Sequence, residues 1–110
     1  MDKILTDSDN ALICPTCNSE YMHHIGVEMY SRKEDETNDV AHITLNEQHS
    51  HGWKVAFSAA QPNSVDKDMT GNPSSRRTGL VISIICEQCK QIHKLGIAQH
   101  KGQTITRWMK

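Results

Sequence analysis

Side chains alternate with a period of two over several segments of the chain, and this alternation predicts half-buried β-strands. In the first segment, residues 21–29, the apolar side chains of Ile, Val and Met share the odd positions with Tyr and His. The second segment, residues 41–45, places Ala, Ile and Leu on one face and His42 and Thr44 on the other. The alternation resumes over residues 53–59, and the polar connection between these two segments predicts a hairpin.

The C-terminal third carries the strongest strand signals. Residues 79–85 are nearly all apolar and rich in β-branched side chains, which predicts the central strand of a sheet. Residues 92–99 and 104–109 flank the sequence HKGQ, and Gly102 can adopt the positive backbone angle that a tight hairpin turn requires. No segment predicts a helix of convincing length. The expected fold is therefore a small antiparallel β protein.

The remaining segments predict loops and a tail. Residues 1–11 are polar and are expected to form a flexible tail in front of a single domain, residues 12–110. The charged run SRKEDETND at residues 31–39 predicts a solvated loop. Residues 61–79 are rich in Pro, Gly, Ser and Thr, so they predict a second, longer loop, and ordered loops of this length are often functional.

The four cysteines form two CxxC pairs, CPTC at residues 14–17 and CEQC at residues 86–89. A structural zinc ion is commonly bound by four thiolates that two such pairs supply, and two intervening residues let the chain fold into a tight knuckle. Pro15 favours the turn. The residue after each pair often needs a left-handed backbone, which suits Asn18 better than Lys90. The expected metal ligands are Cys14, Cys17, Cys86 and Cys89.

The predicted architecture is therefore a zinc ribbon, with two CxxC knuckles on an antiparallel sheet and a long insertion, about residues 31–78, between them. The insertion is compatible with one site, because loop-closure entropy adds only about 0.6 kcal/mol per doubling of length. One structural Zn²⁺ could supply on the order of 10 kcal/mol of folding free energy. A site closed by four cysteines has no position for a catalytic water, so the metal predicts architecture rather than chemistry.

Three other uses of these cysteines remain open. CPTC resembles the CPxC motif of glutaredoxin-like oxidoreductases, but those proteins hold the reactive cysteine at a helix N-terminus. The residues after Cys17 alternate like a strand instead. Two structural disulfides would suit an oxidising compartment. Iron can occupy the same tetrahedral sulfur cage, and the spacing does not separate it from zinc.

Composition and charge narrow the class of protein. Only 36% of the residues are hydrophobic, so the core is thin and a bound metal would add needed stability. Residues 1–13 lack the apolar run of a signal peptide or membrane span, which predicts a protein of the reducing cytoplasm. Residues 1–75 carry 5 basic and 12 acidic side chains, whereas residues 76–110 carry 7 basic side chains and only Glu87. The two parts either neutralise each other after folding or leave a basic face for a polyanion.

The motif GNPSSRRTG at residues 71–79 is the main candidate for a binding surface. Arg and Ser side chains suit phosphate oxygens, so this loop either grips an anion or is a solvated turn. Trp108 offers a stacking plane for a base or belongs to the core. His93 and His100 are expected near the second knuckle or on the basic face. With four thiolates and Zn²⁺ the formal net charge of −1 becomes −3, which argues against strong non-specific DNA binding. The candidate nucleic-acid-binding residues are Arg76, Arg77, Lys94, Lys101 and Arg107.

Other candidate chemistry is sparse. The chain has 7 histidines, and His49 and His51 would point to one side of a strand, where with His42 they could hold a second metal ion. Polar loop and surface residues are the simpler explanation. His23 and His24 would face opposite sides of their strand and so cannot act as a pair. No phosphate-binding glycine loop, nucleophile elbow or acid–base constellation is present, so no enzyme activity is predicted.

Taken together, CPTCNSEYMHH, GNPSSRRTGLVISIICEQC and LGIAQHKGQTITRW resemble a family of small zinc-ribbon proteins encoded by phages and prophages. The family pattern joins CPxC, GNPSxRRxG, CExC and IxQHKGxTxxxW, and the match covers roughly residues 12–30 and 71–108. The resemblance implies a zinc-ribbon fold, the four cysteines as metal ligands and a mobile-element origin, without an established activity. The signature positions are Asn72, Pro73, Arg76, Arg77, Gln99, His100, Lys101, Gly102 and Trp108.

Two kinds of binding module fit the sequence. The first is a non-catalytic module for nucleic acid or a nucleic-acid-processing complex, which would use the arginine loop and the basic hairpin. The second binds a protein, for example as a phage factor that inhibits a host protein, through the acidic residues 28–47 or the hairpin of the insertion. A CxxC oxidoreductase is the third hypothesis. The expected place of action is the cytoplasm of the host, with no membrane and no small-molecule substrate.

Overall fold

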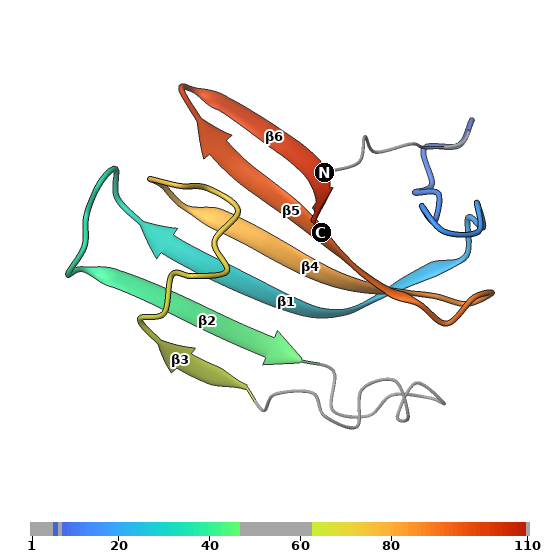
Figure 1. The fold of residues 1–110 in the computed structure, drawn as a ribbon, viewed down its shortest axis with the longest axis horizontal. Helices are drawn as coiled ribbons and strands as arrows, with labels where there is room; N and C mark the ends of the chain where they lie inside the picture. Colours follow the sequence, from blue (N-terminus) through green and yellow to red (C-terminus); the bar gives the residue numbers. More distant parts are fainter. Residues whose placement is uncertain (1–5, 7, 47–62, 110) are drawn as a thin grey trace.

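The computed structural model describes Thr6, residues 8–46 and residues 63–109. They fold into one six-stranded antiparallel sheet with the order β3-β2-β1-β4-β5-β6 (Figure 1). The strands are β1 Met22–Arg32, β2 Val40–Asn46, β3 Ser64–Asp66, β4 Gly79–Cys86, β5 Ile92–His100 and β6 Gln103–Met109. The described residues contain no helix, so the predicted small antiparallel β architecture is confirmed. None of them forms a helix with the length and apolar character needed to cross a lipid bilayer.

The strongest strand predictions are confirmed. β4 lies inside the sheet, between β1 and β5, and its side chains Val81 and Ile85 are 1% and 0% exposed. β5 and β6 form the predicted hairpin. Both turn residues, Lys101 and Gly102, have positive φ angles, 50° and 80°. Two left-handed residues in a two-residue turn match the right-handed twist of the strands, which is why this turn closes the hairpin well.

A β-bulge divides β1 into two halves of opposite alternation. His24 and Gly26 pair with consecutive residues of β4, so Ile25 is an extra residue between them. One extra residue moves every later side chain to the other face of the sheet. As a result Tyr30 is 3% exposed whereas Met29 is 43% exposed. The single odd–even pattern predicted for this strand is therefore wrong beyond the bulge.

The insertion between the knuckles contributes strands to the same sheet. β2 pairs with β1, and the short strand β3 pairs with β2. β3 lies in the predicted long loop, so the prediction that residues 61–79 form only a loop is wrong at Ser64–Asp66. β1 continues to Arg32 and takes in the first two residues of the predicted charged loop. The predicted hairpin partner of β2, residues 53–59, lies outside the described residues.

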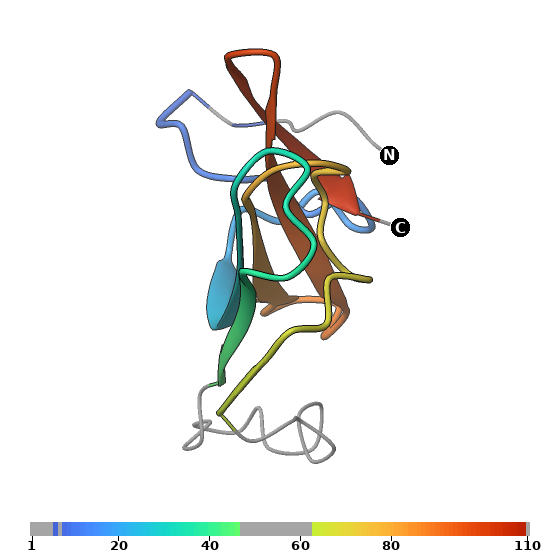
Figure 2. The same ribbon diagram turned by 90° about the vertical axis from the view of Figure 1, so that its left-hand side faces the viewer.

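Different segments cover the two faces of the sheet. The connection from β3 to β4, residues 67–78, crosses one face, which we call the loop face (Figure 1 and Figure 2). On the opposite face, which we call the N-terminal face, Leu12 packs against a cluster formed by Ile84, Leu95 and Trp108. Trp108 is 3% exposed, so it is a core residue and offers no plane for stacking.

The N-terminal face is apolar and less covered away from this cluster. Met29, Leu45 and Val65 lie on three adjacent strands and are 43%, 51% and 72% exposed. The alternation predicted for β2 is correct. However, its polar side chains lie on the loop face, which is covered, and its apolar side chains lie on the less covered face. Val40 and Thr44 are buried on the loop face, because the connection from β3 to β4 crosses there.

Two glycines allow the loop to approach the sheet closely. A Cβ atom at Gly79 of β4 would overlap the Asn72 side chain and lie 2.8 Å from Pro73. A Cβ atom at Gly96 of β5 would lie 3.2 Å from Pro73. The hydroxyl of Ser74, the next residue, donates a 3.0 Å hydrogen bond to the carbonyl oxygen of Gln99. Packing and this hydrogen bond together fasten the GNPSS segment to β4 and β5.

Candidate metal centre

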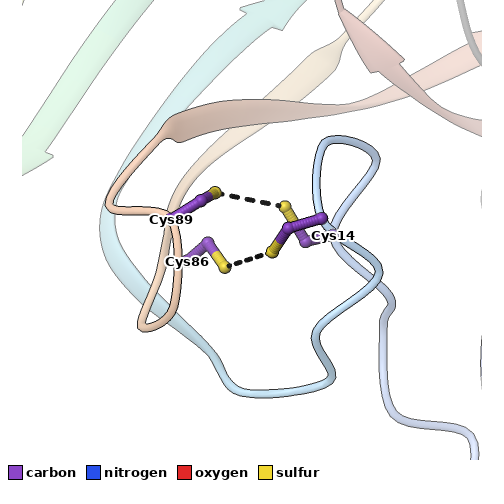
Figure 3. A group of neighbouring side chains, drawn as sticks. Cys14, Cys86 and Cys89 are labelled. Carbon is purple, nitrogen blue, oxygen red and sulfur yellow. Dashed lines mark hydrogen bonds between the residues drawn. The ribbon is translucent and has the colours of Figure 1, made fainter.

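The sulfur atoms of the four cysteines converge at one end of the sheet. All four Sγ atoms lie within 4.8 Å of one another. The Cys17–Cys86 separation is 3.4 Å and the Cys14–Cys89 separation is 3.8 Å. Figure 3 shows the labelled side chains of Cys14, Cys86 and Cys89 pointing toward one another. Zn–S bonds of about 2.3 Å require tetrahedral edges of about 3.8 Å, so the cage fits a tetrahedral metal ion. All four cysteines are free, so none forms a disulfide.

The two knuckles share one pattern of backbone hydrogen bonds. In each knuckle the carbonyl oxygen of the first cysteine accepts a hydrogen bond from the N–H four residues later, at 2.9 Å from Asn18 and 3.0 Å from Lys90. The N–H of the first cysteine donates to the carbonyl oxygen five residues later, at 2.8 Å to Ser19 and 3.0 Å to Gln91. Asn18 and Lys90 have φ angles of 64° and 61°, the predicted left-handed conformation. The knuckle geometry therefore overrides the poor local preference of Lys90 for this region.

Burial and hydrogen bonding lower the pKa of one thiol in the cage and raise the pKa of another. Burial raises the pKa of Cys86, but hydrogen bonds from the backbone of Cys89, the Cys17 thiol and the backbone of Gln88 outweigh it and bring the value to about 6. The backbone N–H of Gln91 lowers the pKa of Cys89, yet burial and the neighbouring thiols together raise it to about 12. One thiolate therefore suppresses the ionisation of its neighbours. Ionising the whole cage requires a cation at its centre.

The cage is assembled by the central strands. The first knuckle precedes β1, and the second connects β4 to β5. Met22 pairs with Cys86 in the β1–β4 ladder, and the Glu87 N–H donates a 2.9 Å hydrogen bond to the carbonyl oxygen of Tyr21. A metal ion bound there would tie the N-terminal segment to the middle of the sheet. The residues after Cys17 lead into a strand, so the helix that would activate a redox cysteine is not formed there.

Two polar side chains lie directly beside the cage. His93 Nε2 is 3.7 Å from the Cys14 sulfur and 3.1 Å from the Thr16 hydroxyl. The His93 ring also lies against Trp108, with ring centroids 5.8 Å apart. The position of His93 near a knuckle agrees with one of the two places predicted for it, whereas no pattern in the sequence points to Thr16. Only the pairing of β5 with β4 brings His93 next to the first knuckle, which is remote in the chain.

The two arginines of the predicted anion-binding loop pair with acidic residues of the β1–β2 connection. Arg76 donates to both carboxylate oxygens of Asp35, at 2.8 Å from Nε and 2.6 Å from Nη2. Arg76 and Arg77 also reach Glu34, at 3.2 Å and 2.9 Å. The hydrogen bond from Arg76 lowers the pKa of Asp35. The acidic run expected to be solvated therefore neutralises part of the arginine loop.

The three other candidate binding residues lie on the β5–β6 hairpin. Lys94 Nζ is 3.9 Å from a carboxylate oxygen of Glu28. Lys101 is exposed in the hairpin turn. Arg107 is partly buried, and its Nε atom is buried without a hydrogen-bond partner among the described residues. The fold brings Arg76, Arg77 and Lys101 around one hollow at the turn end of the hairpin, and Lys94 is not part of it.

A polar network around His42 on the loop face was not predicted. The His42 ring stacks on Tyr30 with centroids 4.2 Å apart and an interplanar angle of 7°. Its Nε2 atom lies 3.0 Å from Glu28 and its Nδ1 atom 2.9 Å from Asp66. Since both ring nitrogens are engaged and the side chain is 11% exposed, His42 links β2 to β1 and β3 and is not available to a metal ion.

The other histidine predictions have separate outcomes. His23 and His24 pair with successive residues of β4 and so face opposite sides of the sheet, as predicted. His23 Nε2 lies 3.0 Å from the Glu87 carboxylate, next to the second knuckle. His49 and His51 lie outside the described residues, so a metal site built on them stays a hypothesis.

Two CxxC knuckles on an antiparallel sheet, with four sulfurs in one cage, define the class of the protein as a small β zinc ribbon. Comparisons with family models, curated proteins and solved structures found no match. The class therefore rests on the geometry of this chain alone. The resemblance to phage-encoded proteins stays a prediction.

Proposed function

We propose that the protein is a phage-type zinc-ribbon protein in which one Zn²⁺ has a structural role. The observation that carries this proposal is the cage of four sulfur atoms within 4.8 Å of one another. Thiolate ligands in a tetrahedron suit Zn²⁺, and iron is the competing occupant. Protein purified without added metal should contain one zinc ion per chain by elemental analysis. Less than stoichiometric metal of any kind would contradict the proposal.

The proposed role of the whole protein is binding rather than catalysis. Four protein ligands fill a tetrahedral site, so neither a water molecule nor a substrate can reach the metal ion without displacing a cysteine. The metal then acts through stability, because it joins the first knuckle to the centre of a sheet whose core is small. The proposed place of action is the cytoplasm, that of the host if the protein is phage-encoded.

The proposed partner is nucleic acid, or a complex that processes it. The support comes from the β5–β6 hairpin, where Lys101 in the turn and Arg107 further along β6 have no carboxylate partner among the described residues. Arg76 and Arg77, which are 57% and 31% exposed, line a hollow together with Lys101. Ion pairs this exposed are worth only about 0–1 kcal/mol, so phosphate groups can compete for the two arginines. The formal net charge of −1 predicts modest affinity with a strong salt dependence.

Fluorescence anisotropy with labelled single- and double-stranded oligonucleotides tests this partner across a salt series. Affinity should fall linearly on a log–log plot, because each phosphate contact releases counterions. Lys101→Gln should weaken binding, whereas Lys33→Gln, the same change of charge on the exposed β1–β2 connection, should have little effect. Absence of binding at low salt would remove nucleic acid as the partner.

A protein partner is the second candidate, and the uncovered part of the N-terminal face favours it. Met29, Leu45 and Val65 form an apolar array across β1, β2 and β3 that water contacts. Exposed apolar patches on small domains often mark binding surfaces. Leu45→Glu should abolish capture of a host protein in a pull-down assay, and Thr37→Glu, on an exposed loop, should leave it intact.

A further inference from the structure

The two loop motifs of the sequence meet at one place in the fold. Residues 73–77 of the GNPSSRR segment and residues 99–101 of the QHKG segment line two adjoining pockets on the loop face, which share Ser74, Ser75, Gln99 and His100 and which together we call the hollow. They are joined directly, because the Ser74 hydroxyl donates a 3.0 Å hydrogen bond to the carbonyl oxygen of Gln99. The same hydroxyl accepts a 3.1 Å hydrogen bond from the N–H of Arg77. Ser74 thus fixes the loop against the hairpin and shapes the hollow between them.

The larger part of this hollow is a pocket of about 270 Å³ with one apolar and one polar side. Its apolar wall is built by Pro73, Ala98 and Ile105. Its polar wall carries Arg107 and the His100 side chain, with the exposed Ser75 at the rim. No carboxylate is among the residues that line it, although the described part of the chain is rich in acidic residues.

Arg107 differs from the other arginines that face this hollow. Its Nε–H is buried with no hydrogen-bond partner among the described residues, whereas Arg76 and Arg77 are paired with Glu34 and Asp35. Arg107 lies opposite Gly96 in the β5–β6 ladder and lines the same pocket as Pro73. A buried donor without an acceptor costs free energy, so native structures supply a partner, water or ion. The position suits an anionic ligand.

We propose that this pocket binds a phosphate group of a nucleotide or nucleic acid, with Arg107 as the central donor. The guanidinium offers a planar fork that matches two phosphate oxygens, and Ser75 and His100, which line the same pocket, can bind the remaining oxygens. The apolar wall takes the sugar or base next to the phosphate. A pocket of about 270 Å³ lies just below the range of small-ligand sites, about 300–1,000 Å³, so it holds one nucleotide unit rather than a large cofactor.

This inference rests on the proposed nucleic-acid function and names the group that is recognised. A free nucleotide and the 5′ end of a nucleic acid both carry a terminal phosphate group. The test therefore compares a free phosphate compound with an oligonucleotide. The probes are sodium pyrophosphate, a thymidine oligonucleotide with a 5′-phosphate and the same oligonucleotide with a 5′-hydroxyl. Each is added to the metal-loaded full chain, and binding is followed by backbone amide chemical shifts and by calorimetry.

Two variants and one control test the pocket. Arg107→Gln removes the charge and the buried donor, and Ser75→Glu adds a carboxylate at the exposed rim with little risk to folding. Each should weaken binding of the phosphorylated probe roughly ten- to a hundredfold, the range expected for charge-assisted hydrogen bonds. Lys33→Gln should leave the affinity within about twofold of the unaltered protein, since exposed charges away from the site contribute little. Metal content and amide spectra verify that each variant is folded.

Each outcome decides the inference. Shift changes confined to the residues that line the pocket, residues 73–75, 98–100, 105 and 107, and to their chain neighbours, that disappear in both variants support it. Binding of pyrophosphate without binding of either oligonucleotide would mean that the pocket takes a free phosphate ligand. This result supports the pocket and contradicts the proposed nucleic-acid function. Oligonucleotide binding that is equal with and without the 5′-phosphate and unchanged in Arg107→Gln overturns the pocket but leaves nucleic acid as the partner. Absence of any shift change with millimolar pyrophosphate and both oligonucleotides overturns the pocket as well.

Discussion

The sulfur atoms of Cys17 and Cys86 lie 3.4 Å apart across the middle of the cage. The two residues belong to different knuckles, so a metal ion bound to both sulfurs would close a loop of the chain that contains β1, β2, β3 and β4. A metal ion there removes conformational entropy from the unfolded chain and ionises thiols that otherwise suppress one another's charge. The stability of the sheet should therefore depend on the metal.

Loss of one ligand should unfold the protein. Structural zinc contributes about 10–16 kcal/mol in small metal-binding domains, which matches the whole stability of a typical domain, about 5–15 kcal/mol. Cys86→Ser should therefore lose the metal ion and the cooperative thermal transition monitored by circular dichroism. Thr16→Ala, beside the cage but not a ligand, should keep one metal ion per chain. If the Cys86→Ser protein is folded although it contains no metal, the stability of the sheet does not depend on the metal centre.

Tyr30 should make the protein sensitive to alkali. Burial raises the pKa of Tyr30 above its usual value of 10.0, and the charge of Glu28 adds to this shift. A raised folded-state pKa gives stability that is complete below pH 10 and is lost as the pH rises above it, because the unfolded chain ionises first. The free energy of unfolding should fall by about 1 kcal/mol between pH 9 and pH 11, because over this range only the tyrosine of the unfolded chain ionises.

Tyr30→Phe should largely abolish this pH dependence in urea unfolding experiments. Tyr21 provides the matched control, because it is 58% exposed. Tyr21→Phe should therefore lose as much stability at alkaline pH as the unaltered protein does. Equal pH profiles for the unaltered protein and Tyr30→Phe would mean that the Tyr30 hydroxyl is not held in the buried environment described above.

Ser74 should be more important for stability than its neighbour. Its buried hydroxyl donates to Gln99 and accepts from Arg77, so Ser74→Ala leaves a backbone carbonyl oxygen and a backbone N–H without their partner. This should cost about 1–3 kcal/mol in urea unfolding. Ser75→Ala, at an exposed position one residue later, should change stability by less than about 0.5 kcal/mol. Equal effects of the two changes would contradict the fastening of the loop to β5.

Release of Arg76 from its ion pair should increase affinity for nucleic acid. Asp35→Asn removes the bidentate partner of Arg76 and leaves only its longer contact with Glu34, so it should strengthen oligonucleotide binding roughly two- to fivefold, with a steeper salt dependence, because phosphate then competes with one exposed carboxylate instead of two. Asp39→Asn makes the same change in net charge nearby, where the side chain pairs with no arginine. If both variants gain equally, net charge and not the Arg76 guanidinium controls binding.

Local signals in the sequence were enough for the knuckles and for five of the six described strands, β3 being the exception. CxxC spacing fixes two sulfurs on one turn, and the left-handed conformation of Asn18 and Lys90 follows from the same turn. The apolar run of β4 and the HKGQ turn of the β5–β6 hairpin likewise depend on neighbours within a few residues. The prediction of one four-cysteine cage followed because tetrahedral coordination needs both pairs.

Other features depend on contacts between segments remote in sequence, and only the tertiary structure decided them. The bulge at Ile25 reverses the alternation of β1 because β4 pairs around it, which no pattern within β1 reveals. The arginine loop proved to be partly neutralised, because the fold places Asp35 beside Arg76. For the same reason the buried Nε of Arg107, which has no partner among the described residues, lies in a pocket that Pro73 also lines. The sequence by itself determined the longer strands and the four sulfurs that can form one metal cage, since those depend on local geometry. The partners of each charge were decided by strand register, which is a property of the whole sheet.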